Sequence, residues 1–374
     1  MPLKNIVIDA RLYGPKHTGI GRYTKNLLIA LSDLPQFSKY RFTVVTYNDL
    51  RSDIQADLGN KFQYVFTDIP HYSLLEQIKF PSLLNQLHPD LVHFTHFNKP
   101  FLYSGKSVVT IHDLIKHYFH GPKTTTRNPF LYWPKYWLYR LLTDHVIKTN
   151  PLIVPTVYWQ KKLATDFNLK PTQITVTQEA VDPKFLHHQA KSVSGGKLKI
   201  ENYLVYTGNL YPHKNLIVLL QALKFLPDIK LKIISARNFF TDKLQSQIKS
   251  LNLQSQVEFL GYLTDAEFSQ VYSHALALVH PSLMEGFSLT GLEAMALNCP
   301  VISSNASCLP EVYGQSVLYF DPFKPMALVD QIKKLQASDT LRQKLIKLGQ
   351  LQVAKYSWTK TAQKTMAVYE KLLT

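Results

Sequence analysis

Apolar and polar residues alternate along the first half of the chain in a pattern typical of an α/β protein. Residues 23–31 and 158–167 have the periodicity of amphipathic helices. Short apolar runs around these helices predict buried strands at residues 6–8, 42–46, 91–94, 108–111, 152–155 and 174–176. This alternation predicts a parallel sheet with helices on both faces.

The same pattern begins again near residue 203. It predicts helices at residues 216–226, 243–251 and 265–274 and strands at 203–206, 231–234, 257–259, 275–279 and 301–303. Residues 182–199 between the two blocks are polar and contain Ser, Gly and Pro, as expected of a linker. We therefore expect two doubly wound, Rossmann-like domains, residues 1–182 and 183–356, which face each other across a cleft.

Composition agrees with two domains and restricts the class of protein. The chain has 374 residues, too many for one ordinary core, and 45% of them are hydrophobic. It contains no run of 18 apolar residues, so we expect no transmembrane helix. The start lacks a signal-peptide layout, and the two cysteines, Cys299 and Cys308, form no CxxC motif. These features predict a cytoplasmic protein without disulfide bonds or structural zinc.

The chain is strongly basic, with 42 Lys and Arg against 26 Asp and Glu, a net charge of +16. Residues 1–178 carry +10 of this charge. A basic excess indicates an anionic partner such as a phosphate ligand, an anionic lipid or a nucleic acid. Because the sequence has no nucleic-acid-binding motif, phosphate and lipid are the expected partners.

The most informative stretch, residues 280–296, contains two glutamates separated by seven residues. A strand ends just before it, and a helix is predicted from Leu289 onward, with Ser288 as its N-cap. The unpaired amides and the dipole of a helix N-terminus suit a phosphate. Glu285 before the helix and Glu293 inside it could bind hydroxyls on either side of a diphosphate, which is the layout of a nucleotide sugar.

A solvated surface position is the simplest alternative for each glutamate. Most isolated glutamates in helices are exposed. The pair is less ordinary because Gly286 and Phe287 are poor choices for an exposed helix. Spacing alone leaves both interpretations open.

The whole stretch resembles the E-x7-E motif of the family 4 glycosyltransferases, retaining enzymes of the GT-B fold. The similarity includes residues 281–282, 286–287, 292–296 and 299–302. It implies that Glu285 contacts the transferred sugar and Glu293 the ribose. It also implies a donor site that contains Phe287, Ser288 and Leu289, the last two through backbone amides. The resemblance further implies that the C-terminal helix, residues 357–374, packs back on the first domain.

Two motifs of the first half fit the same family. Gly19 and Gly21 follow the first strand and open a helix, although a lone GxG is equally a tight turn or an incomplete dinucleotide fingerprint. His112 and Asp113 follow another strand, at the end where ligands bind in such sheets, although histidine is common there. The resemblance implies that Gly19 approaches the donor diphosphate, that His112 hydrogen-bonds the sugar, and that Asp113 orients His112 or the loop.

Lys214 lies near a helix start in the second half, where a lysine is by default on the surface. Residues 208–215 resemble the family's G-x-L-x-x-x-K-N pattern, which implies that Lys214 binds the diphosphate. Asn209 stands where many relatives have Arg, so either His213 or Arg237 replaces that charge or Lys214 and helix dipoles suffice. The sequence offers no acidic metal clamp beside these motifs, so we expect no metal or other cofactor.

Six aromatic residues occur within residues 130–139. The segment 123–148 also contains five basic residues, Lys123, Arg127, Lys135, Arg140 and Lys148. Aromatic residues with basic flanks suit weak contact with an anionic membrane surface. A helix buried against the first sheet is the alternative, and both stay open.

The resemblance extends over nearly the whole chain and implies a retaining, metal-independent transferase. The enzyme would move a hexose or deoxyhexose, of mannose, glucose or rhamnose type, from a nucleotide diphosphate sugar to a glycan or lipid-linked oligosaccharide. Its place would be the cytoplasmic side of the cell membrane, in cell-surface polysaccharide synthesis. The alternatives are a non-catalytic sugar-nucleotide or glycan-binding subunit and a GT-B epimerase. A dehydrogenase is disfavoured because the third glycine of its fingerprint is missing.

Overall fold

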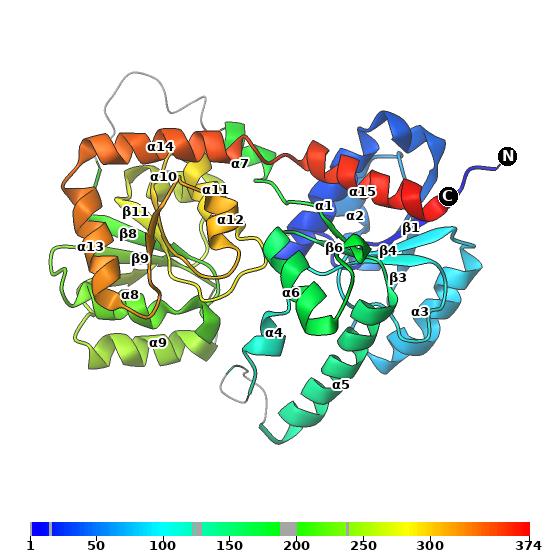
Figure 1. Cartoon of the computed structure of the whole chain (residues 1–374), viewed down its shortest axis with the longest axis horizontal. Coiled ribbons are helices and arrows are strands. Elements are labelled where there is room, and N and C mark those ends of the chain that lie inside the picture. The colour runs from blue at the N-terminus through cyan, green and yellow to red at the C-terminus, as the bar shows by residue number, and fades with distance from the viewer. Residues whose placement is uncertain (1, 15–16, 122–123, 125–128, 188–199, 237–238) are drawn as a thin grey trace. The chain divides into compact units, whose positions relative to one another are not determined.

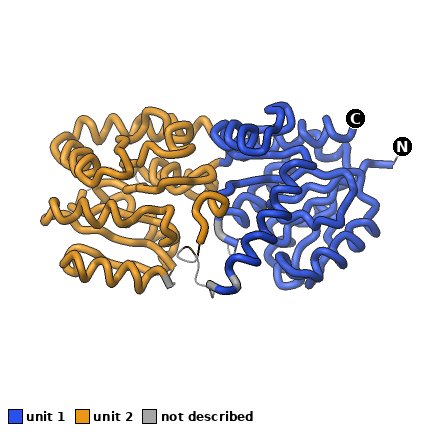
Figure 2. The backbone as a smooth tube through the Cα atoms, turned by 60° about the horizontal axis from the view of Figure 1, so that its bottom comes forward, with its two compact units in different colours: residues 1–114, 130–179, 357–374 blue, residues 115–129, 180–356 orange. Residues whose placement is uncertain are grey.

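A computed structural model describes residues 2–14, 17–121, 124, 129–187, 200–236 and 239–374. The chain divides into two compact units (Figure 2). Unit 1 contains Met1–Leu114, Phe130–Glu179 and Ser357–Thr374, and unit 2 contains Ile115–Pro129 and Ala180–Tyr356.

Unit 1 is built around a parallel sheet in the order β3-β2-β1-β4-β5-β6-β7. The strands are β1 (Asn5–Asp9), β2 (Arg41–Tyr47), β3 (Gln63–Thr67), β4 (Leu91–Phe94), β5 (Ser107–Thr110), β6 (Leu152–Val154) and β7 (Ile174–Val176). The helices are α1 (Thr18–Ser32), α2 (Arg51–Leu58), α3 (Leu74–Gln86), α5 (Pro129–Thr149), α6 (Val157–Phe167) and α15 (Trp358–Leu373) (Figure 1). The strand order reverses between β1 and β4, which makes their carboxyl ends the switch point of this sheet.

Unit 2 repeats this architecture with the strand order β10-β9-β8-β11-β12-β13. Its strands are β8 (Tyr203–Thr207), β9 (Lys230–Ile234), β10 (Val257–Phe259), β11 (Ala277–His280), β12 (Val301–Ser304) and β13 (Leu318–Phe320). Its helices are α4 (Ile115–Tyr118), α7 (Pro183–His187), α8 (Leu216–Leu223), α9 (Phe239–Ser250), α10 (Asp265–His274), α11 (Leu289–Ala296), α12 (Leu309–Tyr313), α13 (Pro325–Gln336) and α14 (Asp339–Val353). Both sheets are doubly wound and parallel, so the predicted fold class is confirmed.

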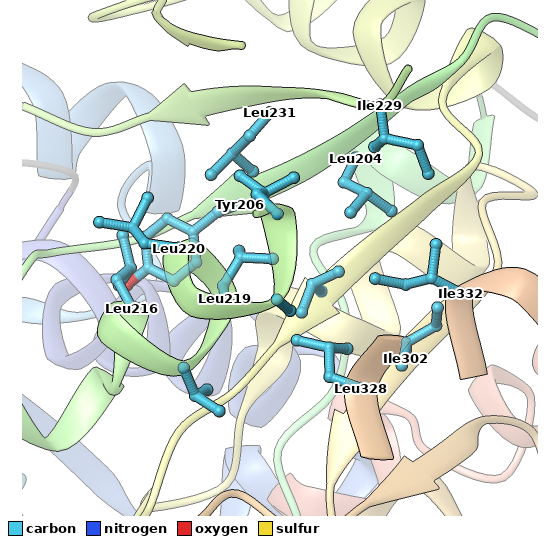
Figure 3. Close-up of a cluster of buried hydrophobic side chains, with 14 of the residues drawn as sticks. Leu204, Tyr206, Leu216, Leu219, Leu220, Ile229, Leu231, Ile302, Leu328 and Ile332 are labelled. Carbon is cyan, nitrogen blue, oxygen red and sulfur yellow. The ribbon is translucent and has the colours of Figure 1, made fainter. Parts of the chain in front are cut away.

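The core of unit 2 explains why its strands have continuous apolar runs. Leu204 and Tyr206 of β8 and Leu231 of β9 pack against Leu219 of α8, while Ile302 of β12 faces α13 (Figure 3). All these side chains are buried. Complete burial of one Leu or Ile side chain contributes about 1.5–3 kcal/mol, so each face of the sheet needs a helical cover.

Several elements were not predicted. Strand β3 lies at the sheet edge, where three of its five residues are only half-buried, and β13 has three residues. Pro81 lies inside α3 and obscures its helical pattern. The predicted linker is partly wrong, because residues 183–187 form α7, where Phe185 is buried and packs on Phe268. Residues 188–199 of that segment lie outside the described residues.

The C-terminal helix α15 belongs to unit 1, where it packs on α1. Tyr369 of α15 places its hydroxyl 2.6 Å from Nδ1 of His93 in β4, and Lys106 donates to the carbonyl of Leu372. Among the helices of the described residues, none combines the length and apolar character needed to cross a membrane.

Candidate functional site

The carboxyl ends of β8 and β11 form the switch point of the unit 2 sheet. The loops that leave these strands are tied together, because the amide of Leu283 donates to the carbonyl of His213 at 2.8 Å. The side-chain amide of Asn215 also donates to the carbonyl of Pro281 at 3.2 Å. Asn215 has a left-handed backbone with φ of 55° and ends the 3-10 turn Pro212–Lys214. This turn brings Lys214 to the loop that contains Glu285.

Glu285 is buried and held by two cationic or donating groups. Nζ of Lys214 lies 2.8 and 2.9 Å from its carboxylate oxygens, and Nε2 of His280 lies 2.9 Å from Oε1. Burial alone would raise the pKa of Glu285, but Lys214 and His280 hold that pKa well below its usual range. At neutral pH the carboxylate is therefore ionised, and it is suited to accept hydrogen bonds from hydroxyl groups rather than to donate a proton.

Ser288 occupies the N-cap position of α11, as predicted, but its side chain makes no capping hydrogen bond. Its backbone is left-handed, with φ of 82° and ψ of 69°. Its hydroxyl lies 2.6 Å from the Tyr313 hydroxyl and 3.1 Å from Nδ1 of His280. The serine hydroxyl thus leaves the amides of the first turn of α11 uncapped, and the Tyr313 hydroxyl instead accepts from the amide of Gly291 at 3.1 Å.

Glu293, in the second turn of α11, is also buried, with 4% of its surface exposed. Burial, with a contribution from the Glu293 charge, raises the pKa of Tyr272, whose hydroxyl donates to Thr207 at the end of β8. The surface interpretation of the two glutamates is therefore wrong. The reason is tertiary, because α11 packs under α14, where Met295 contacts Gly349.

Other predicted residues of unit 2 have different environments. Phe287 is buried and packs edge-on against Tyr356, with ring centroids 5.3 Å apart, so its backbone is the part suited to meet a ligand. Asn209 is exposed. Burial and the neighbouring Lys214 lower the pKa of His213 to about 4, so its ring is neutral at pH 7. Arg237 lies outside the described residues.

His112 lies just after β5 in unit 1, in the region of the switch point. Its Nε2 donates to the carbonyl of Thr95 at 3.0 Å, and its Nδ1 lies 3.1 Å from a carboxylate oxygen of Glu179. The ring of Tyr23 contacts it edge-on at 4.5 Å. Glu179 therefore orients His112, which the sequence did not suggest. Asp113 is half-buried, and its role in orienting His112 or the loop stays a prediction. A hydrogen bond from His112 to a sugar would exchange with one of these two bonds.

Gly19 and Gly21 lie in the first turn of α1 rather than in a loop, because the helix begins at Thr18. A Cβ atom on Gly21 would lie 1.9 Å from the carbonyl oxygen of Gly14, so the close approach of the preceding chain requires glycine there. Gly19 is exposed, and a Cβ atom on it would meet no atom of the described residues within 4 Å. Gly19 thus has the open space that a ligand would need, whereas Gly21 serves chain packing.

Sequence reasoning missed several residues that shape these sites. His280 lies five positions before Glu285, but Tyr313 is 28 positions beyond Glu285 and has no local signal. In unit 1, the buried Arg11 pairs with Asp9 and Glu76 at 2.8 and 2.6 Å. Arg11 and Asp9 line a small polar pocket with Leu12, His71, Thr95, His96 and Asn98. No group of three or more His, Cys, Asp or Glu side chains in the described ranges is arranged to hold a metal ion.

Two family models match the chain in succession. The model described as Glycosyltransferase Family 4 matches residues 17–185, and the model described as Glycosyl transferases group 1 matches residues 188–352. Together they account for most of both units.

Curated relatives include bacterial enzymes of polysaccharide synthesis. The chain is 32% identical over 181 residues to O-antigen chain mannosyltransferase B of Escherichia coli, a match that covers 47% of the chain and about half, 48%, of that relative. It is 26% identical over 347 residues to O-antigen chain mannosyltransferase RfbU of Salmonella typhimurium, which covers 88% of the chain and 91% of the relative.

Solved structures share the fold at low sequence identity. Sucrose-phosphate synthase from Thermosynechococcus elongatus matches with a TM-score of 0.74 and 17% identity over 99% of both chains. Anabaena Alr3699/HepE, solved in complex with UDP, matches with a TM-score of 0.70 and 14% identity over 99% of this chain and 100% of that one. At these identities the similarity concerns the fold.

Proposed function

Because the chain belongs to family 4 of the glycosyltransferases, with the GT-B fold, we propose that it transfers a hexose or deoxyhexose from a nucleotide diphosphate sugar to a hydroxyl group. The acceptor in this proposal is a glycan or lipid-linked oligosaccharide in cell-surface polysaccharide synthesis. Two relatives named O-antigen mannosyltransferases favour mannose over glucose and rhamnose as the sugar. HepE in complex with UDP supports a nucleoside diphosphate as the carrier.

The observation that carries the proposal is the buried, ionised Glu285 beside Lys214 in front of the α11 N-terminus. A fixed carboxylate accepts hydrogen bonds from sugar hydroxyls, while the lysine and the helix amides suit a diphosphate. Glu293, buried further along α11, is proposed to contact the ribose. In this proposal the donor's sugar lies at Glu285, its diphosphate at Lys214 and the helix amides, and its nucleoside at Glu293.

The chemistry proposed is retaining and metal-independent. The bond between the sugar C1 and the diphosphate oxygen breaks, and a bond from C1 to the acceptor oxygen forms on the same face. The acceptor proton passes to the leaving phosphate oxygen, so the protein need not supply a nucleophile. Lys214 and the amides of Ser288 and Leu289 stabilise the charge that develops on the diphosphate. In unit 1, the contacts of Gly19, His112 and Asp113 with the donor stay predictions that rest on the resemblance.

A donor panel followed by one substitution tests the proposal. UDP-, GDP-, dTDP- and ADP-sugars are screened by thermal shift, and the best donor is then assayed for transfer and hydrolysis. Glu285→Gln should lower turnover by a factor that corresponds to about 2–4 kcal/mol, because one charged contact in a buried site is lost. Affinity for the free nucleoside diphosphate should stay within a few-fold. The matched control is Glu258→Gln, an exposed glutamate of β10. Near-normal turnover in Glu285→Gln would remove Glu285 from the site.

The same assay separates the alternatives. A non-catalytic subunit would bind the donor without transfer or hydrolysis, and an epimerase would return a donor with altered sugar stereochemistry.

Weak contact with an anionic membrane surface is a further part of the proposal. Helix α5 exposes Phe130, Trp133, Trp137, Leu138 and Leu141, while Tyr132 and Tyr136 are buried and stack on each other. The helix is thus neither wholly core nor wholly surface. Lys135 and Lys148 are exposed beside the apolar residues, which suits an interface with acidic headgroups. Lys123 and Arg127 of the same segment lie outside the described residues.

A further inference from the structure

The Tyr313 hydroxyl is a buried meeting point of four polar atoms. It lies 2.8 Å from Nδ1 of His280 and 2.6 Å from the hydroxyl of Ser288, and it is within reach of the Ser288 carbonyl at 3.2 Å. The backbone amide of Gly291, in the first turn of α11, donates to it at 3.1 Å. No surface of Tyr313 is exposed, so these contacts are made out of contact with water. The hydroxyl therefore links the start of α11 to His280.

The chemistry of the end groups sets the direction of the hydrogen bonds. The Glu285 carboxylate only accepts, so Nε2 of His280 carries the hydrogen that points to it. We assign Nδ1 of His280 as the acceptor of the single Tyr313 hydroxyl hydrogen, because this contact, at 2.8 Å, is shorter than that of Nδ1 with the Ser288 hydroxyl, at 3.1 Å, and that of the Tyr313 hydroxyl with the Ser288 carbonyl, at 3.2 Å. In this assignment Tyr313 accepts in turn from Ser288 and from Gly291. Each donated hydrogen then has one acceptor along the series that runs from the Gly291 amide through Tyr313 and His280 to the Glu285 carboxylate. Such a chain fixes the tautomer and the ring orientation of the histidine.

Gly291 and Tyr313 also fit each other sterically. A Cβ atom on Gly291 would lie 2.3 Å from both Cζ and the hydroxyl oxygen of Tyr313, so any other residue at 291 would displace the tyrosine. A glycine inside a helix costs up to about 1 kcal/mol relative to alanine. Here the absence of a side chain allows the tyrosine hydroxyl to reach the helix backbone.

We propose that Tyr313, through His280, is a positioning residue for Glu285 in the transfer reaction. This inference rests on the proposed function for its kinetic consequence. The hydrogen-bond chain keeps the His280 hydrogen on Nε2, so that His280 and Lys214 together hold the carboxylate in one orientation. It also holds Ser288 in the left-handed conformation from which α11 starts.

Tyr313→Phe tests the inference, because it removes the hydroxyl and keeps the ring. With the best donor of the panel, kcat/KM should fall about tenfold, since one buried hydrogen bond of the chain is lost, while the dissociation constant of the free nucleoside diphosphate stays within twofold. Tyr203→Phe is the matched control. Tyr203 is buried in unit 2, and its hydroxyl donates to the Val271 carbonyl, which does not belong to the series of hydrogen bonds from Gly291 to Glu285. Equal losses in the two variants would overturn the positioning role.

A double-mutant cycle shows whether Tyr313 acts through Glu285. The measured quantity is the ratio of the dissociation constants of the nucleotide sugar and the free nucleoside diphosphate, obtained by calorimetry. Tyr313→Phe should change this ratio in the wild-type background and leave it unchanged, within twofold, in the Glu285→Gln background. Equal effects in both backgrounds would show that Tyr313 acts independently of Glu285 and overturn the proposal.

A measurement without substrate separates this inference from the proposed function. In ¹⁵N-histidine spectra at pH 7, with His280 assigned through His280→Gln, the wild type should show hydrogen on Nε2 and an accepting Nδ1. Tyr313→Phe should move the Nδ1 signal, and Tyr203→Phe should not. A hydrogen on Nδ1 in the wild type, or an unchanged Nδ1 signal in Tyr313→Phe, would refute the proposed hydrogen bonds from Tyr313 through His280 to Glu285, even if transfer is observed. If no donor is turned over, the spectra still decide the matter.

Discussion

Ser288 has a backbone conformation that serine adopts only at a cost. Its φ of 82° lies in the left-handed region, where the Cβ atom comes too close to the following carbonyl oxygen. This conformation costs about 1–2 kcal/mol. Its hydroxyl is bonded to the Tyr313 hydroxyl at 2.6 Å, which offsets that cost. The conformation and the hydrogen bonds therefore depend on each other.

Two substitutions at Ser288 separate the cost of the backbone conformation from the contribution of the hydroxyl hydrogen bonds. Ser288→Ala keeps the Cβ atom and loses the hydroxyl, so it should lower the free energy of unfolding by about 1–2 kcal/mol. Ser288→Gly loses the hydroxyl but relieves the crowding, so it should remain within about 1 kcal/mol of the wild type. Urea titration of both variants measures the difference. A glycine variant less stable than the alanine variant would contradict the explanation.

At the scale of elements, the attachment of α15 depends on a neutral histidine in β4. His93 is completely buried between Tyr369 of α15 and Thr110 of β5. Burial lowers the pKa of His93 to about 3, against about 6.5 in an unfolded chain. Between these values the unfolded chain binds a proton that the folded unit does not, so stability falls as the pH falls.

His93→Gln should therefore weaken the pH dependence of stability. The variant is expected to be less stable than the wild type at pH 7.5, because it loses buried hydrogen bonds. Lowering the pH to 4.5 should reduce the difference in the free energy of unfolding between the wild type and His93→Gln by about 2–3 kcal/mol, because the wild type loses about 1.4 kcal/mol per pH unit below 6.5. His88→Asn, at an exposed position with a left-handed backbone, serves as the control whose gap to the wild type stays constant. A constant gap for His93→Gln in urea titrations would show that His93 does not couple to pH.

At the scale of the whole molecule, the proposed chemistry takes the positive charge that balances the diphosphate from the protein and not from a metal ion. Lys214 and the α11 amides are the groups proposed for it, and Arg237, which lies outside the described residues, stays a predicted contact. Transfer should accordingly persist in EDTA, with turnover within about twofold of the untreated enzyme. An assay after dialysis against EDTA, with Mg²⁺ or Mn²⁺ added back, checks this. A strict requirement that either metal restores would contradict the metal-independent chemistry.

The proposed membrane contact also concerns the whole chain, because it combines the net charge of +16 with the apolar surface of α5. Lys135→Glu with Lys148→Glu should reduce sedimentation with anionic vesicles, since each basic residue near such a surface contributes about 1 kcal/mol at low salt. Lys333→Glu with Lys334→Glu, exposed on α13 of unit 2, changes the net charge equally and is the control. Donor affinity should be unchanged in both. Equal losses of vesicle binding would assign it to net charge alone.

The sequence determined the doubly wound class, most strands and the residues of the donor motifs. Hydrophobic periodicity is local, and buried parallel strands such as β8 and β11 are continuous apolar runs that need no knowledge of their neighbours. The spacing of Glu285 and Glu293 is likewise local, because it follows from a strand, a loop and a helix in succession.

Tertiary structure decided the environment of those residues. The burial of Glu293, the neutral state of His213 and the pairing of His112 with Glu179 all depend on segments distant in the chain. Tyr313 reaches Gly291 only because α12 and α11 pack together. Hydrogen bonds and desolvation act through space, so a sequence can supply the residue types of a site while the packing of its elements sets their protonation, orientation and strain.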